Sequence, residues 1–419
     1  MTTNSALSAS LRSLRLRRLL AGAGVLAFAA VAFTGSPAWG EPREKIVLAN
    51  SCLVPVECSA AEALLIKGEL YIINPDGSKP IRLTNDSFSD ALPALSPDGK
   101  GKIVFDSNRI AGFRLDILRF DSDLFLINAD GTVDGGLQPR PLTQGQLGGG
   151  SSASFDPTGK NIVFHRSASP PPEQPYGTRI KNFNLIGFRN EPGGPTTDSD
   201  IFLVNLDDLL ETGELPVNLT NGLTSTPGVR GPYASDDADW SPDGKWIAFT
   251  SRIPNVEFDQ ADAGIYVMNL ETKLVTKLTN LTNSGPEERS PAWSPDGTHI
   301  AIMRRPEPPI PLQPFEIWVL GFDPASDPPR VTTEIQLTDN TTADLSPAWS
   351  PRGEKIVFHA NRPGPGNSQI FVIDANGQKC KPGDCSETAL TGPSAPTGAL
   401  QGQNLFPKWG LIAVGQDPQ

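Results

Sequence analysis

Short runs of apolar residues, each bounded by polar and turn-forming residues, recur along almost the whole chain. Residues 245–249 and 355–358 are runs that follow a turn, and residues 265–268 and 370–373 belong to a second set rich in β-branched and aromatic side chains. Runs of four or five such residues between turn signals are typical of β-strands. The pattern therefore predicts a protein built from many short strands.

A Ser-Pro-Asp-Gly phrase, usually preceded by Trp, separates these runs at intervals of about fifty to eighty residues. Pro presets φ for a tight turn, Asp bonds its own backbone, and Gly accepts a positive φ, so each copy predicts a hairpin turn. The copies begin at Ser96, Asp156, Ser241, Ser294 and Ser350, and Trp409-Gly410 is a degenerate sixth copy.

A second repeated sequence, the dipeptide Leu-Thr, which we call the Leu-Thr mark, ends the last strand of each repeat. It occurs at Leu83-Thr84, Leu142-Thr143, Leu219-Thr220, Leu278-Thr279, Leu337-Thr338 and Leu390-Thr391. Four short antiparallel strands repeated radially are the arrangement of a β-propeller, whose blades bury their faces against their neighbours. Six marks therefore predict an all-β, six-bladed β-propeller with four antiparallel strands per blade.

The ends of the repeat array predict how the ring closes. Residues 45–48 correspond to the second strand of a blade and have no turn phrase of their own, while residues 404–410 supply the missing inner strand. A blade shared by the N- and C-terminal segments would pair two edges that are otherwise open.

The phrases at residues 290–297 and 346–351 resemble the repeats of the TolB-like six-bladed propellers (PD40, WD40-like repeats). The resemblance covers nearly all of the chain after residue 40. It implies the propeller fold, and it is only weakly informative about function, because such repeats occur in periplasmic binding proteins, in peptidase gating domains and in some lyases. TolB itself carries an α/β domain before its propeller, whereas here the repeats follow the first forty residues directly.

Residues 1–40 have the pattern of a signal peptide. Four arginines, the last of them Arg18, precede an apolar stretch over residues 19–33, and residues 38–40 form a small-x-small cleavage site. An uncleaved anchor is the alternative, but the stretch is shorter than the roughly 20 residues of a spanning helix. We therefore expect residues 41–419 to be the propeller of a periplasmic or secreted protein, with no transmembrane segment after signal removal.

The formal net charge is −12, and loss of the four leader arginines makes it −16. A strongly acidic surface repels nucleic acid, which excludes that class of partner. The need for solubility is enough to explain the negative charge, so no partner that recognises acidic residues is required. We expect the protein to be a monomer. The cysteines form two close pairs, Cys52 with Cys58 and Cys380 with Cys385, which in an oxidising compartment predict two local disulfides rather than a metal site.

The loops that enter the inner strands and those that join the second and third strands share one face of a propeller, around the channel mouth. The longest of these loops, residues 167–199, would form a lid, a partner patch or a plain surface insertion. Alignment of the blades places several charged residues at the mouth: Asp90, Asp236, Glu288, Arg289 and Asp344. Such a partial ring fits a cation, a metal or a basic peptide, and the alternative is acidic turn residues that stay solvated.

The ends of the second strands contribute a further candidate set, namely Asp106, His165 and His359, with Arg109, Arg252 and Arg362 just beyond them. The two histidines occupy equivalent positions in opposite blades and would face a common ligand across the channel. Two histidines are few for a metal centre, so the alternative is that each is satisfied within its own blade.

No Gly-x-Ser-x-Gly elbow and no phosphate-binding glycine loop occur in the sequence. We therefore expect an exported, non-catalytic module that binds or scaffolds an envelope or extracellular protein or peptide. It would need no cofactor, and the channel mouth leaves room for a bound cation. The alternative is a metal-assisted carbohydrate lyase or hydrolase that uses His165 and His359.

Overall fold

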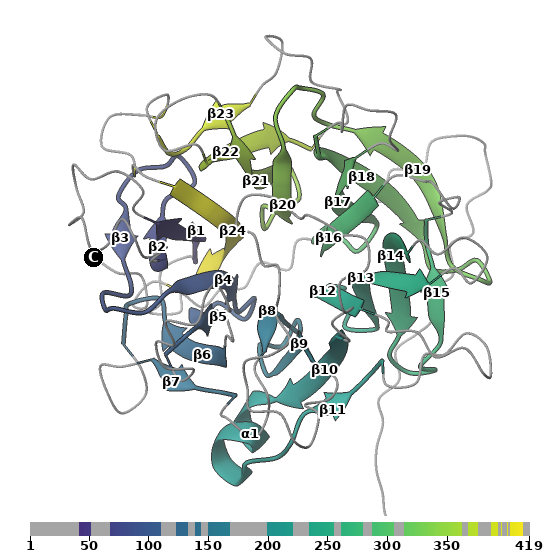
Figure 1. Cartoon of the computed structure of the whole chain (residues 1–419), viewed down its shortest axis with the longest axis horizontal. Coiled ribbons are helices and arrows are strands. Elements are labelled where there is room, and N and C mark those ends of the chain that lie inside the picture. Colours follow the sequence, from purple (N-terminus) through teal and green to yellow (C-terminus); the bar gives the residue numbers. More distant parts are fainter. Residues whose placement is uncertain are drawn as a thin grey trace, which may run out of the picture. The chain divides into compact units, whose positions relative to one another are not determined.

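Six blades of four antiparallel strands surround a central axis, and a short parallel pairing of Ser199 with Ala234 joins two neighbouring blades into one eight-stranded sheet (Figure 1). The computed structural model describes residues 42–51, 68–109, 123–132, 139–143, 150–167, 199–220, 234–254, 261–279, 287–305, 314–362, 368–375, 387–392, 395, 400 and 403–413. All of them lie in the unit Trp39–Gln419. The predicted signal peptide and residues 168–198 of the long loop are outside the described residues. The all-β, six-bladed propeller predicted from the repeats is confirmed.

We number the blades 1 to 6 in chain order. The inner strands of blades 1 to 6 are β24 (Gln403–Ile412), β4 (Asp90–Leu95), β8 (Ser151–Phe155), β12 (Ala234–Trp240), β16 (Glu287–Trp293) and β20 (Asp344–Trp349). The second strands are β1 (Arg43–Ser51), β5 (Lys102–Ser107), β9 (Asn161–Ser167), β13 (Trp246–Pro254), β17 (His299–Arg305) and β21 (Lys355–Asn361). The third strands are β2 (Gly68–Ile73), β6 (Asp123–Asn128), β10 (Ser199–Asn205), β14 (Ala261–Asn269), β18 (Glu316–Asp323) and β22 (Ser368–Asp374). The outer strands are β3 (Ile81–Arg82), β7 (Arg140–Pro141), β11 (Val217–Asn218), β15 (Val275–Lys277), β19 (Arg330–Gln336) and β23 (Thr388–Ala389).

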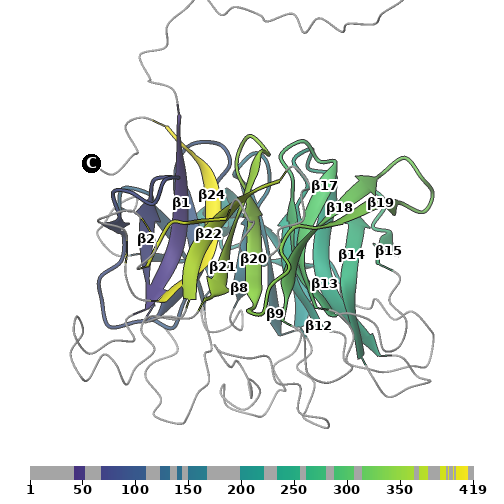
Figure 2. The same cartoon turned by 90° about the horizontal axis from the view of Figure 1, so that it is seen from above.

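Blade 1 is shared by the two ends of the repeat array, as the sequence predicts. β1 pairs with β2 on one side and with β24 on the other, both antiparallel. The side chains reinforce this closure, since Asn50 Nδ2 donates to Asn404 Oδ1 at 3.0 Å. Figure 2 shows β1 and β24 beside each other, with the strands of all blades running between the same two faces.

The repeated turn and Leu-Thr marks have the same contacts in each blade. The turn glycines at 99, 159, 244, 297 and 353 have φ between +67° and +76°, which fits the predicted hairpin turns. Each Leu-Thr threonine hydroxyl accepts a backbone N–H of the third strand of its blade. The donor is the second residue of that strand in blades 2 and 5 and the equivalent residue in the other four blades. The Leu-Thr mark therefore anchors the outer strand to the third strand.

The core lies between the blades. Each of six buried apolar clusters joins residues of two neighbouring blades. The tryptophan that precedes the turn belongs to these junctions: Trp349 is 9 % exposed, and its Nε1 donates to the Ala292 carbonyl of the preceding blade at 3.0 Å. Burial of these faces favours stacking of the repeats into a ring.

Every inner strand carries a β-bulge, where its register against the second strand shifts. At each bulge one non-glycine residue has φ near +50°, in the left-handed region: Phe406, Leu92, Ser152, Asp237, Ser290 and Ser346 in blades 1 to 6. Bulges re-aim side chains and are common beside functional sites. These six equivalent residues, which we call the bulge ring, therefore lie on the strands nearest the axis (Figure 1).

One short helix interrupts blade 3. α1 (Leu206–Thr212) follows β10, begins at the N-cap Asn205 and ends at Gly213, whose φ is +73°. Its buried Leu206 joins the cluster between blades 2 and 3. Across the described ranges, none of the helices has the length and apolar character needed to span a membrane.

Candidate functional site

Three carboxylates predicted at the channel mouth are buried at the start of their inner strands. Asp90, Glu288 and Asp344 are each 0 % exposed. Each is paired with an arginine from the second-strand end of its own blade: Arg109 Nη1 lies 2.7 Å from Asp90 Oδ1, Arg304 Nε lies 2.6 Å from Glu288 Oε1, and Arg362 Nη1 lies 2.6 Å from Asp344 Oδ1.

These pairings differ from the open ring of solvated charges that the sequence suggests. Burial raises the pKa of Asp90 to about 6, opposed by the Arg109 charge and hydrogen bonds. The pKa values of Glu288 and Asp344 are also raised by burial and opposed by Arg304 and Arg362, respectively. The charge of each carboxylate is thus largely met inside its blade, and whether any of them contacts a partner stays a prediction.

The arginines at the second-strand ends also stack on an aromatic residue of the third strand. The guanidinium of Arg109 lies 5.4 Å from the Phe125 centroid, and that of Arg362 lies 5.0 Å from the Phe371 centroid. Equivalent contacts are made by Arg166 over Phe202 and Arg304 over Trp318, whereas in blade 4 the cation over Tyr266 is Lys277 of the outer strand. Such cation–π contacts hold the cation in place and orient it towards the buried carboxylate.

Asp106 and His359 contact the bulge ring of the following blade. Asp106 Oδ1 accepts the N–H of Ser152 at 3.2 Å, and Asp106 Oδ2 accepts the Ser151 hydroxyl. His359 Nδ1 accepts the N–H of Phe406 at 3.4 Å. Burial lowers the pKa of His359 to about 3, so its ring is neutral and accepts this bond.

His165 occupies the equivalent position in blade 3, but its surroundings are different. Burial raises the pKa of Asp237, the bulge-ring residue of blade 4, and the nearby His165 opposes that rise. The Nδ1 atom of His165 is buried and has no hydrogen-bond partner among the described residues. His165 therefore lies near Asp237, whereas His359 bonds Phe406, and no interaction among the described residues joins the two histidines.

The bulge ring has a polar arc and an apolar arc. Asp237 Oδ2 accepts the Ser290 hydroxyl at 3.0 Å, and its carboxyl also bonds the Ser152 side chain. Hydrogen bonds therefore connect three consecutive blades, 3, 4 and 5, around the axis. Leu92 and Phe406 occupy the same position in blades 2 and 1.

The inner strand of blade 4, Ala234–Trp240, is the most acidic of the six. Asp236 accepts the Ser199 hydroxyl at 2.6 Å, and Asp239 accepts the Ser154 hydroxyl at 2.7 Å and the Trp293 N–H at 2.8 Å. Among the described residues, Asp236, Asp237 and Asp239 form no ion pair with lysine or arginine. This strand therefore carries carboxylates with hydrogen-bond partners but no neutralising guanidinium.

The remaining predicted residues are placed as follows. Arg289 is 6 % exposed and pairs with Glu287, whose carboxylate also contacts Arg305. Arg252 lies in β13 opposite Ala234. The four cysteines of the predicted disulfides, Cys52, Cys58, Cys380 and Cys385, lie outside the described residues. Within the described ranges, no group of three or more His, Cys, Asp or Glu is arranged to hold a metal ion.

Two elements of the site were not predicted from the sequence. The first is Asp237, which is displaced by one position from the aligned mouth residues because the bulge inserts it into the ring. The second is a polar residue near the start of the third strand in five of the six blades, which binds the Leu-Thr hydroxyl, as Glu69 does with Thr84 at 2.8 Å. The sequence does contain a signal for this polar residue. An acid or amide precedes the apolar run of the third strand in five of the six repeats: Glu69, Asp123, Asp200, Glu316 and Gln369.

Comparisons with known proteins support the propeller. Residues 237–399 match the TolB beta propeller domain family, PD40. TolB from Acinetobacter baumannii superposes with a TM-score of 0.52 at 17 % identity, over 88 % of this chain and 66 % of that one. At this identity the likeness shows the fold alone.

Two curated relatives are similar over shorter stretches. The probable dipeptidyl-peptidase 5 of Emericella nidulans is 25 % identical over 48 % of this chain and 29 % of its own length. The Tol-Pal system protein TolB of Alcanivorax borkumensis is 40 % identical over 15 % of this chain and 13 % of its own length. The chain thus spans less than a third of these relatives.

Proposed function

Because the chain is a TolB-like six-bladed β-propeller, we propose that it works as a binding or scaffolding module that captures a protein or peptide segment at its channel mouth. Further, we propose that this occurs at the cell envelope, in the periplasm or outside the cell, since residues 1–40 have the signal-peptide pattern and one relative is a Tol-Pal system protein.

The observation that carries the proposal is the difference in charge balance between the inner strands. In blades 2, 5 and 6 the mouth carboxylate is buried against an arginine, so little of its charge is available to a partner. In blade 4 no lysine or arginine pairs with the three aspartates of β12 among the described residues; they accept hydrogen bonds, and His165 lies near Asp237. Carboxylates beside the axis that lack an arginine partner favour a cationic group, so the segment that binds there should carry Lys or Arg.

A capture experiment tests this proposal. The propeller, residues 41–419, would be immobilised and probed with a lysine-rich decapeptide, its glutamine-substituted equivalent and an extract of the producing cells, with the metal content of the same preparation recorded. We expect the lysine peptide to bind, the glutamine peptide to bind at least about tenfold more weakly, and binding to fall with salt.

Variants locate the site. The double substitution Asp236→Asn, Asp237→Asn removes two charges from β12, and Asn can still accept the serine hydroxyl bonds. The matched control, Asp208→Asn with Glu271→Gln, removes two exposed charges elsewhere. Equal peptide capture by both variants and the parent protein would contradict a role for β12. A tightly bound transition metal in the parent protein, with no peptide capture, would instead favour the alternative of a metal-assisted carbohydrate lyase or hydrolase.

A further inference from the structure

A pocket lies at the end of the strands opposite to the predicted channel mouth. Its residues are the first of β5, the last of β6, one of β7 and the helix α1: Lys102, Leu126, Ile127, Asn128, Arg140, Asp207, Leu210 and Glu211. The mouth residues Asp106 and Arg109 lie at the opposite end of β5 and just beyond it. The pocket is therefore separate from the site of the proposed function, and it holds about 200 Å³.

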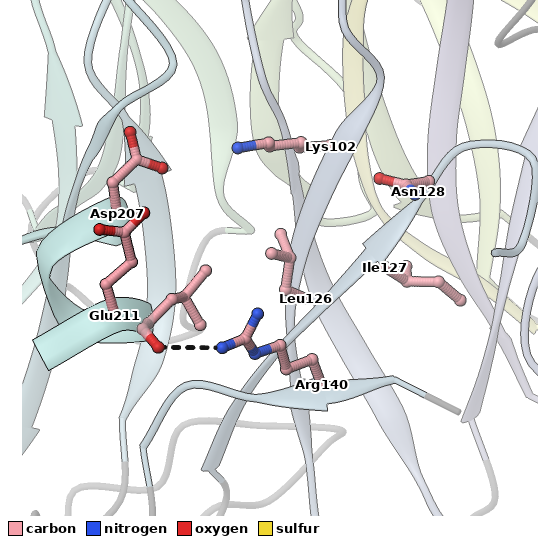
Figure 3. A pocket seen from close by; sticks show the side chains of 8 residues that line it. Lys102, Leu126, Ile127, Asn128, Arg140, Asp207 and Glu211 are labelled. Atoms are coloured by element: carbon pink, nitrogen blue, oxygen red, sulfur yellow. Dashed lines mark hydrogen bonds between the residues drawn. The ribbon is translucent and has the colours of Figure 1, made fainter. Parts of the chain in front are cut away.

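Opposite charges face one another across this pocket without pairing. Figure 3 shows Lys102 and Arg140 reaching from blade 2 towards α1, where Asp207 and Glu211 lie on the other side. Within the described part of the chain, none of these four side chains forms an ion pair. The sole hydrogen bond drawn in the pocket runs from Arg140 Nη2 to the Leu210 carbonyl at 3.0 Å.

The same contact sets the width of the pocket. Arg140 bonds the backbone of α1, which ties the outer strand of blade 2 to the helix of blade 3. Leu206 is buried in the cluster between these two blades, and Leu209 and Leu210 pack against it, so the helix cannot approach Lys102 freely. The acidic and basic walls are therefore held apart by packing rather than by chance side-chain positions.

The floor of the pocket is apolar. Leu126 is 8 % exposed and Leu210 completes the apolar surface, whereas the side chain of Ile127 belongs to the cluster between blades 1 and 2, on the other side of β6. A basic wall, an acidic wall and an apolar floor match a small molecule that carries a carboxylate, an ammonium group and a hydrocarbon side chain. A volume of about 200 Å³ suits one such unit rather than a long peptide.

We propose that this pocket binds a small zwitterion with an apolar side chain, of the α-amino-acid class. Its carboxylate would contact Lys102 and Arg140, and its ammonium group would contact Asp207 and Glu211. The hydrocarbon side chain would cover Leu126 and Leu210.

The test uses the whole propeller and three probes that share the leucine side chain: L-leucine, N-acetyl-L-leucine, which lacks the ammonium charge, and L-leucinamide, which lacks the carboxylate. Binding would be followed by saturation-transfer NMR and calorimetry. We expect saturable binding of L-leucine, with both blocked probes at least about tenfold weaker, since each loses a charge-assisted hydrogen bond. Absence of saturable L-leucine binding, or equal binding of all three probes, would overturn the proposal.

Two variants and two controls assign the binding to this pocket. Lys102→Gln and Glu211→Gln each remove one wall charge and should weaken L-leucine binding about tenfold. Lys245→Gln, at the turn of blade 4, and Glu214→Gln, just beyond the C-cap of α1, change exposed charges that do not line the pocket. Undiminished binding in both wall variants would also overturn the proposal. The blocked probes test it in the parent protein independently of any effect of substitution on folding.

Discussion

The junction between blades 1 and 2 and the junction between blades 5 and 6 have the same polar framework and different charge balances. Each contains an acid that begins the third strand, a buried aspartate that begins the next inner strand, and an arginine that pairs with that aspartate. These residues are Glu69, Asp90 and Arg109 at the first junction and Glu316, Asp344 and Arg362 at the second. Their linking residues, Asp86 and Asn340, also correspond, since each donates its N–H to the third-strand acid.

The difference lies at the outer edge of the blade. At the first junction Arg82 Nη2 lies 2.7 Å from Glu69. At the second, the equivalent residue is Gln336, which like Arg82 bonds the carbonyl of the Leu-Thr threonine but brings no charge. Glu387 adds another carboxylate, paired with Arg362 at 2.9 Å. Within the described residues, the three carboxylates of the first junction, Glu69, Asp86 and Asp90, have two guanidinium groups, those of Arg82 and Arg109. The three carboxylates of the second, Glu316, Asp344 and Glu387, have one, that of Arg362.

The consequence is seen in Glu316. Burial raises its pKa to about 8, and the adjacent Asp344 charge adds to the rise, although Thr338 and the Asn340 N–H oppose it. A protonated Glu316 can donate to Asp344, which keeps two buried acids compatible. The replacement of Arg82 by Gln336, together with the added Glu387, therefore leaves the second cluster with fewer cations than the first and with a proton on Glu316.

The largest expected effect comes from removal of the cation at the first junction. Arg109→Met should lower the free energy of unfolding by about 3–5 kcal/mol, because Asp90 would be left buried without its partner. Urea denaturation at pH 7 measures this. Arg330→Met, at a 70 % exposed arginine, is the control and should cost less than about 0.5 kcal/mol. A similar small cost for both would mean that the buried pair does not stabilise the junction.

An intermediate effect should follow from Glu316→Gln, and it should depend on pH. The native pKa lies above the ordinary value of 4.5, so the folded state holds the proton more tightly than the unfolded one. The stability contributed by this group is complete below about pH 4.5 and is lost as the pH rises through about 8. Glu316→Gln, which cannot ionise, should therefore be more stable than the parent at pH 9, by about 1–3 kcal/mol.

Thermal or urea unfolding between pH 5 and pH 9 measures the effect. Glu69→Gln is the matched control, because it removes the ion pair with Arg82 and should not stabilise the protein at pH 9. A parallel pH dependence in Glu316→Gln and the parent would show that Glu316 is ionised throughout.

The smallest effect should come from exchange of the outer-strand residues. Gln336→Arg would place a guanidinium beside Glu316, and Arg82→Gln would remove one from Glu69. Because Arg82 is 36 % exposed, each change should alter stability by about 0.5–1 kcal/mol at pH 8, with a gain for Gln336→Arg and a loss for Arg82→Gln. Changes of the same sign in both variants would refute the charge-balance account.

The sequence predicts the ring far better than it predicts the site. The turn phrase and the Leu-Thr mark act within a few residues or between adjacent strands, so their chemistry is visible in the repeats. The burial of Asp344 cannot be predicted from the repeats in this way. It depends on a contact with Arg362, which is 18 residues away in sequence, and on the packing of Phe371 against that guanidinium. The inner-strand bulges also shift each alignment by one position, which is why Asp237 was overlooked.

The shared blade also bears on the order of folding. The contact between Asn50 and Asn404 joins residues 354 apart in sequence, whereas blades 2 to 6 are each built from one continuous stretch. Closing so long a loop has an entropic cost that is repaid only when the other blades already hold the two ends together. Blade 1 should therefore be the last to form, both during synthesis and on refolding. Until it does, the open edge of β1 can accept the β24 of another copy, so domain-swapped association competes with ring closure at high concentration.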